Sequence, residues 1–175
     1  RIGEYMAKGK YEYWLTQEQT IKELKANVMW ESVGNEKNLE DNIVESIEEI
    51  CEGLHLPLIE AIGRQKMINT GEFFVKPDIM VRHIDGTMTV FEVKKDNAKY
   101  PSTGTSNQMN AVGQLLLYKN VLESIIGGLV RAALIDNKIH YRTYCAFIGN
   151  RLPITLIDFQ KDRVFVPYNG GEIAG

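Results

Sequence analysis

The chain has 175 residues, a net charge of −3 and an isoelectric point of about 5.7. Its 44% hydrophobic and 25% charged residues are typical of a water-soluble domain that can bury a core. An acidic chain is not built mainly to coat nucleic-acid phosphates, although a local basic rim could still guide an anionic substrate. The apolar runs are too short to cross a bilayer and no secretory signal opens the sequence, so we expect a cytoplasmic protein without membrane contact.

The two cysteines, Cys51 and Cys145, stand in apolar surroundings and lack the spacing of a metal site. We expect buried free thiols in a reducing compartment, with a disulfide left open as an alternative. Three scattered histidines and no cysteine cluster argue against a structural zinc ion.

Two helices are predicted in the first third of the chain. Residues 1–35 form an N-terminal helical extension, in which Thr16 is a suitable N-cap. Residues 36–54 form a second helix with a wide apolar stripe, which Gly53 ends. The predicted main domain covers residues 36–175.

Strands dominate the middle of the chain. Residues 58–62 and 65–68 form a first strand with an irregular link, and a turn follows at 69–71. Residues 72–82 and 88–94 form two further strands with alternating faces.

The second half mixes both element types. A polar surface loop is predicted at 95–106, a long helix at 107–124, and a tight turn at 136–137. The expected fold class is therefore α/β (α+β), with a central mixed β-sheet flanked by helices. The strands expected after the long helix are 129–135, 139–148 and 154–159, and residues 164–166 are the candidate for a fourth.

The register of the hairpin around Asp85-Gly86 decides which acidic side chains meet. A two-residue turn would place Asp78 and Glu92 on opposite faces of the sheet. A three-residue loop with Gly86 in a left-handed conformation pairs His83 with Thr87 and sets Asp78 opposite Glu92. We favour the second register, because it keeps the apolar residues together on one face and the acids together on the other.

Glu92 and Lys94 point to the same side, because alternate residues of a strand share a face. Carboxylates facing each other repel unless a proton or a cation lies between them, and hard oxygen ligands suit Mg²⁺ or Mn²⁺. Val93 could add its backbone carbonyl to such a metal site. Lys94 could orient a water molecule or stabilise charge on a phosphate.

Pro77-Asp78 followed by Glu92-Val93-Lys94 on adjacent strands resembles the motif of the PD-(D/E)XK nuclease superfamily. The likeness covers roughly residues 36–148 and implies a restriction-endonuclease-like core. In this family a preceding helix usually supplies another acid to the metal site. Glu40 is the candidate that the resemblance implies here, and Glu36 is the alternative.

Gln114 and Tyr118 are four residues apart on the predicted helix and therefore share a face. They resemble the QxxxY element of the RecB-like, Cas4-like and type I restriction branches. That resemblance implies roles for both residues in orienting the active site or the DNA strand. Half-buried packing of one helix face is the alternative interpretation.

The resemblance implies a Mg²⁺-dependent deoxyribonuclease of restriction, phage defence, recombination or repair, for which Mn²⁺ could substitute. The alternative is a catalytically inactive nucleic-acid-binding or assembly module with the same fold. DNA is the expected partner, with a helicase or specificity subunit and oligomerisation as further expectations. DNA or RNA, strandedness, endo- or exonuclease action and sequence specificity stay open. Predicted contacts to the nucleic acid are Lys95, Lys99, Tyr100 and Asn110.

Overall fold

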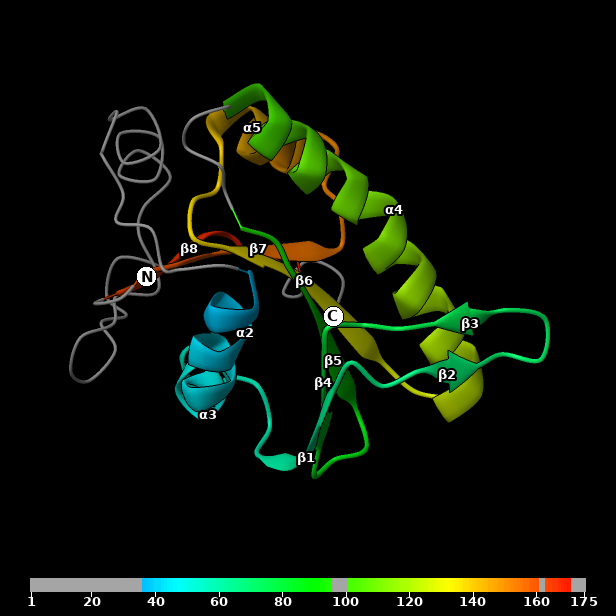
Figure 1. Ribbon diagram of the computed structural model, residues 1–175. Helices are drawn as coiled ribbons and strands as arrows, with labels where there is room; N and C mark the ends of the chain where they lie inside the picture. The colour runs from blue at the N-terminus through cyan, green and yellow to red at the C-terminus, as the bar shows by residue number, and fades with distance from the viewer. Residues whose placement is uncertain (1–35, 96–100, 161–162, 171–175) are drawn as a thin grey trace.

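A computed structural model describes residues 36–95, 101–160 and 163–170 of the chain. The predicted N-terminal extension at 1–35 lies outside the described residues. The structure has a mixed α/β architecture, in which a six-stranded central sheet is flanked by helices on both faces (Figure 1). The predicted fold class is therefore confirmed.

The central sheet has the strand order β1-β4-β5-β6-β7-β8. Strands β5, β6 and β7 run parallel, whereas β1, β4 and β8 pair antiparallel to their neighbours. The six strands are β1 (Ile59–Arg64), β4 (Ile79–His83), β5 (Met88–Val93), β6 (Val130–Asp136), β7 (Ile154–Phe159) and β8 (Val164–Tyr168).

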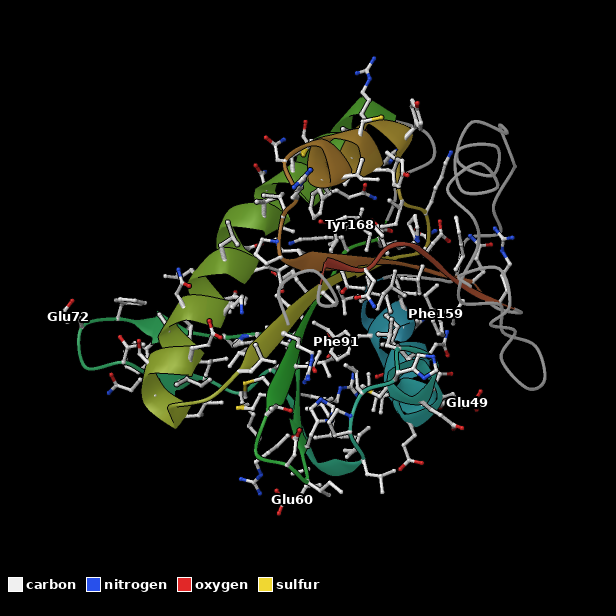
Figure 2. All side chains as sticks on the ribbon, turned by 180° about the vertical axis from the view of Figure 1, so that it is seen from behind. Glu49, Glu60, Glu72, Phe91, Phe159 and Tyr168 are labelled. Carbon is white, nitrogen blue, oxygen red and sulfur yellow. The ribbon has the colours of Figure 1, made fainter. Side chains whose placement is uncertain are left out.

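One face of the sheet is covered by α2 (Glu36–Glu45) and α3 (Ile47–Gly53). The single predicted helix at 36–54 is thus divided at Ser46, but its apolar stripe packs as expected. Figure 2 shows Phe91 and Phe159 on this side of the sheet. Both belong to a core that also contains Leu39, Ile43, Ile47, Ile50, Ile79, Val81, Val93 and Ile135.

The other face is covered by α4 (Pro101–Ile126) and α5 (Tyr141–Gly149). The second core lies between these helices and the sheet, and it includes Val90, Leu115, Tyr118, Leu134 and Phe147. Because consecutive strand residues alternate between the faces, Glu92 lies on the α4 side, between the buried Phe91 and Val93 of the α2–α3 side.

Three predictions of local structure are wrong. Residues 139–148 are mostly helix α5, because His140, Thr143, Tyr144 and Phe147 are buried at helical spacing. Residues 101–106 begin helix α4 instead of belonging to a loop, and proline is well tolerated in a first helical turn. Cys145 is exposed, whereas Cys51 is buried as expected and both are free thiols.

The remaining differences concern where elements begin and end. The predicted strand at 72–82 is divided into β3 (Phe74–Val75) and β4. β3 pairs with β2 (Ile68–Asn69) in a separate two-stranded sheet. The first predicted strand is likewise divided between β1 and β2. Residues 136–137 end β6 and lead through a bend toward α5, so they form no hairpin turn.

Candidate active site

The β4–β5 hairpin has the three-residue register that the sequence favours. Ile79 pairs with Phe91 and Val81 with Thr89. His83 N–H donates to Thr87 O at 2.9 Å, and Gly86 has a φ of 87° in the loop. One step beyond the pair Ile79 and Phe91, Asp78 therefore stands opposite Glu92, on the face that α4 covers.

The side chain of Asp78 accepts a hydrogen bond from the backbone of the neighbouring strand. Its Oδ2 accepts a hydrogen bond from Val93 N–H at 2.8 Å. Pro77 precedes it and has no N–H of its own, and β4 begins only at Ile79. The side chain of Asp78 thus continues the pairing of β4 with β5 beyond the end of the ladder, and this contact fixes its carboxylate beside Glu92-Val93-Lys94.

Glu92 and Lys94 form an ion pair on the same face. Lys94 Nζ lies 3.7 Å from Glu92 Oε2, and the Glu92 side chain is only 4% exposed. The backbone of Lys94 is held by β6, since its N–H donates to Ile135 O at 2.9 Å. The Lys94 ammonium is thus a counter-ion beside the buried Glu92 carboxylate.

Tyr118 of α4 lies within the electrostatic reach of both acids. Burial raises the pKa of Tyr118 to about 12, and the negative charges of Glu92 and Asp78 add to this effect. The phenol therefore stays protonated at neutral pH and can donate a hydrogen bond. Gln114, its predicted companion, is exposed on the same helix, so the structure brings only Tyr118 into the buried core.

Glu40 reaches the site through Gln65. The Glu40 side chain is only 9% exposed, and its Oε1 accepts a hydrogen bond from Arg64 Nε at 3.1 Å. Gln65 Nε2 donates to Glu40 Oε2 at 3.0 Å and to Asp78 Oδ1 at 2.9 Å. One amide group thus links the helix acid to the strand acid. The alternative, Glu36, lies in the first turn of α2.

Gln65 and Asp136 were not found from the sequence. Gln65 has a φ of 50° and follows β1, and nothing in its local pattern points to Asp78. Asp136 is 1% exposed and ends β6, one step beyond the pair of Val93 and Ile135, on the α4 face. Gln108 Nε2 donates to Asp136 Oδ2 at 2.9 Å. The sequence does contain one signal for Asp136, namely an acidic residue at the end of an apolar strand, where ligands often bind in α/β sheets.

The predicted nucleic-acid contacts are only partly placed. Lys95 is half-buried directly after the Glu92–Lys94 segment, and Asn110 is exposed on α4. Lys99 and Tyr100 lie outside the described residues.

Within residues 36–95, 101–160 and 163–170, no three His, Cys, Asp or Glu side chains are grouped closely enough to hold a metal ion. The chemistry of the oxygen donors nevertheless suits Mg²⁺, which needs only one or two protein carboxylates and otherwise retains water. Asp78 and Glu92 would supply these two carboxylates, and the Val93 carbonyl, between them and Lys94 in the chain, would be a third oxygen donor. Glu40 could join them only after the Gln65 amide has moved away.

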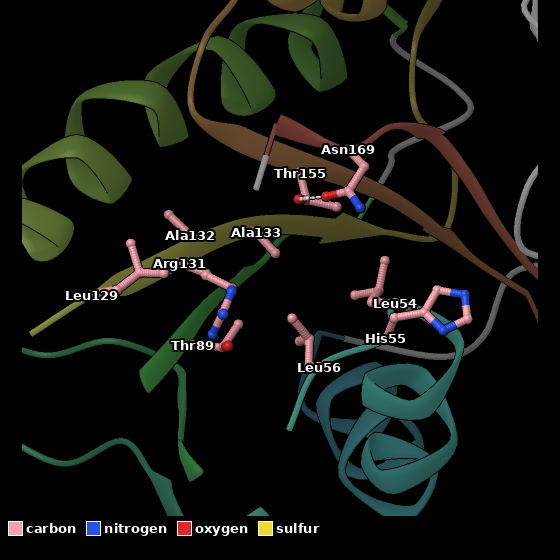
Figure 3. Close-up of a pocket in the computed structure, with 10 residues that line it drawn as sticks. All are labelled: Leu54, His55, Leu56, Thr89, Leu129, Arg131, Ala132, Ala133, Thr155 and Asn169. Atoms are coloured by element: carbon pink, nitrogen blue, oxygen red, sulfur yellow. Dashed lines mark hydrogen bonds between the residues drawn. The ribbon is translucent and has the colours of Figure 1, made fainter. Parts of the chain in front are cut away.

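A cavity of about 360 Å³ lies on the opposite face of the sheet (Figure 3). It is bordered by the end of α3 at Leu54–Leu56 and by Thr89, Arg131 and Thr155 of the sheet. Arg131 donates a hydrogen bond to Thr87 Oγ1 at 3.0 Å. None of the predicted catalytic residues lines this cavity, so it is separate from the candidate active site.

No family model and no curated protein matches the chain. Among solved structures, it is similar to a protein described as an EndoMS–dsDNA2 complex, with a TM-score of 0.45 and 21% identity. The match covers 83% of this chain and 50% of that one, so the chain spans about half the length of the matched protein. No described helix has the length and apolar character needed to cross a membrane.

Proposed function

We propose that the chain is a divalent-metal-dependent nuclease that hydrolyses phosphodiester bonds in DNA. The observation that carries the proposal is the hairpin register, which brings Asp78 opposite Glu92 with Lys94 beside it. Two acids and a lysine on one face of adjacent strands are suited to binding a cation and a phosphate together.

A divalent cation bound by Asp78, Glu92 and the Val93 carbonyl would polarise the phosphate and make water more acidic. Lys94 would stabilise the negative charge that builds up on the phosphate, since its ammonium already lies beside Glu92. Tyr118 would donate a hydrogen bond from its neutral phenol to a phosphate oxygen or a water molecule. Asp136, opposite Lys94 when the β5–β6 register is continued by one residue, would add negative charge on the same face.

A catalytically inactive DNA-binding or assembly module is the second candidate. It is favoured by one observation: both oxygens of Asp78 and both of Glu40 already accept hydrogen bonds from protein donors. Such a closed arrangement would need no cation. This candidate predicts DNA binding without cleavage at any concentration of Mg²⁺ or Mn²⁺.

The test is incubation of the protein with plasmid and single-stranded DNA in Mg²⁺, Mn²⁺ or chelator. We expect metal-dependent cleavage that falls at least about 100-fold in Asp78→Asn and Lys94→Met. Glu60→Gln is the matched control, because Glu60 is an exposed β1 residue paired with Arg82 and should leave cleavage unchanged. Cleavage that persists in Asp78→Asn and Lys94→Met would exclude this site.

A helicase or specificity partner and oligomerisation remain predictions, and the choice between DNA and RNA as substrate stays open. Parallel assays on RNA of the same sequence test the substrate, and sedimentation of the purified chain tests oligomerisation.

A further inference from the structure

The β2–β3 hairpin extends beyond the central sheet, next to the lower end of α4 (Figure 1). We call residues 66–77 the β2–β3 arm. Figure 2 shows Glu72 at its tip, pointing away from the body of the protein. The arm leaves the sheet directly after Gln65 and returns directly before Asp78, so both of its ends are attached to the candidate active site.

The arm has a defined structure. Ile68 pairs with Val75 and Asn69 with Phe74. At the tip, Thr70 N–H donates to Phe73 O at 2.9 Å, and Asn69 Oδ1 accepts a hydrogen bond from Gly71 N–H at 2.8 Å. Val75 is buried and belongs to the core under α4. One face of the arm is therefore anchored to the body.

The other face exposes apolar side chains that the core does not use. Phe74 is 62% exposed and Met67 is 64% exposed, and Phe73 at the turn is 41% exposed. Continuing the register by one residue sets Met67 opposite Lys76, which is exposed on the same face. Lys66 adds a second exposed cation at the base of the arm.

Aromatic rings flanked by cations suit a nucleic-acid strand, in which bases alternate with phosphates. A protein partner would be expected to cover a surface with fewer lysines, because interface cores are depleted in them. A strand advances roughly 3.3 Å per residue, so Phe74 lies at most roughly 13 Å along the chain from Asp78. That length corresponds to about four stacked bases.

We infer that the β2–β3 arm binds a single-stranded segment of DNA beside the cleaved bond, with a base stacked on Phe74. Lys66 and Lys76 contact the neighbouring phosphates. This inference rests on the proposed nuclease function, because the arm acts on the strand that Asp78 and Glu92 would cleave. It adds a substrate class, namely DNA that has unpaired bases within about four nucleotides of the cleaved bond.

The experiment measures binding of a fluorescent single-stranded oligonucleotide, and of the same sequence as a duplex, in chelator. The wild-type chain should prefer the single strand. Phe74→Ala should weaken that binding about 5- to 140-fold, as loss of one base–aromatic stack does, and Phe74→Trp should preserve it. A 2-aminopurine base placed near the cleaved bond should be quenched by the wild type but not by Phe74→Ala.

Ile84→Ala is the matched control. Ile84 is 63% exposed, but it follows the end of β4 that lies farthest from Asp78. Equal binding by Phe74→Ala and Ile84→Ala would overturn the role of the arm while the wild type still cleaves DNA. A wild-type dimer that dissociates in Phe74→Ala would also overturn it, since a second copy would then cover the arm. Absence of both binding and cleavage in the wild type would instead reject the proposed function, and the inference with it.

Discussion

Gln65 is joined to Asp78 twice. Its backbone N–H donates to Asp78 O at 2.9 Å, and its side-chain Nε2 donates to Asp78 Oδ1, also at 2.9 Å. Because the same Nε2 also donates to Glu40 Oε2, the amide lies between two carboxylates, where a divalent cation would otherwise relieve their repulsion. We therefore expect cation binding and the Gln65 contacts to compete.

Gln65→Met tests this competition. Loss of the shared donor should lower the free energy of unfolding in chelator by about 1–3 kcal/mol. Mn²⁺ should then stabilise the variant more than the wild type, because no amide has to be displaced. Urea denaturation with and without Mn²⁺ measures both effects.

Gln160→Met provides the comparison for that experiment. Gln160 also donates to a carboxylate, Asp158 Oδ1 at 3.1 Å, but far along the sheet from Asp78. It should lose stability without gaining a larger response to Mn²⁺. If Mn²⁺ stabilises Gln65→Met less than the wild type, Gln65 is itself a ligand and the competition does not exist.

Tyr118→Phe should separate catalysis from packing. The ring remains in the core, so the free energy of unfolding at pH 7 should change by less than about 1 kcal/mol. Loss of the phenol donor should reduce kcat on DNA roughly 10- to 100-fold. Tyr144→Phe, on α5 in the same core, is the control and should leave kcat unaffected. An unchanged kcat in Tyr118→Phe would assign Tyr118 to packing alone.

The hairpin could be predicted because its evidence is local. The residues from Asp78 to Val81 and from Thr89 to Val93 alternate between faces, and a one-residue slip would mix acids with apolar residues. Helix α5 was missed because its aromatic and β-branched residues also suit a strand. A helix is favoured because it buries Thr143, Tyr144 and Phe147 together. That burial depends on strand β8 and helix α4, which are distant in sequence.

The link from Glu40 to Asp78 could not be predicted from the sequence. Glu40 could be placed on the inner edge of its helix by spacing alone, and it is indeed buried. Its connection to the strand requires Gln65, which lies 25 residues away from Glu40 in sequence and has a left-handed backbone. No periodic pattern contains such a contact, since it arises only when β1 pairs with β4.

His83 should make the protein less stable in acid. It is fully buried, its Nδ1 lies 2.7 Å from Pro57 O, and its Nε2 lies 2.8 Å from Thr89 Oγ1. Burial lowers the pKa of His83 from its usual 6.5, with Arg131 contributing in the same direction. The unfolded chain therefore binds the proton more readily than the folded one. The contribution of His83 to the free energy of unfolding is fully present above pH 6.5 and decreases as the pH falls below that value.

His83→Gln should reduce the dependence of unfolding free energy on pH between pH 7 and roughly pH 5. Urea denaturation at several pH values measures that slope. His55→Asn is the control, because His55 is exposed and its φ of 57° is one that asparagine tolerates. The same slope in His83→Gln and the wild type would show that other groups cause the acid sensitivity.

Gly86 should be required for the register that brings Asp78 and Glu92 together. Its φ of 87° lies in a region that strains any residue with a Cβ atom, although nothing lies within 4 Å of a Cβ placed there. Gly86→Ala should therefore lower the free energy of unfolding by about 1–2 kcal/mol through backbone strain alone. Gly149→Ala, at the end of α5 and equally open, has no positive φ and should be neutral or slightly stabilising. Thermal and urea unfolding of the two variants compare these effects, and equal stability of both would mean that the loop does not need its left-handed glycine.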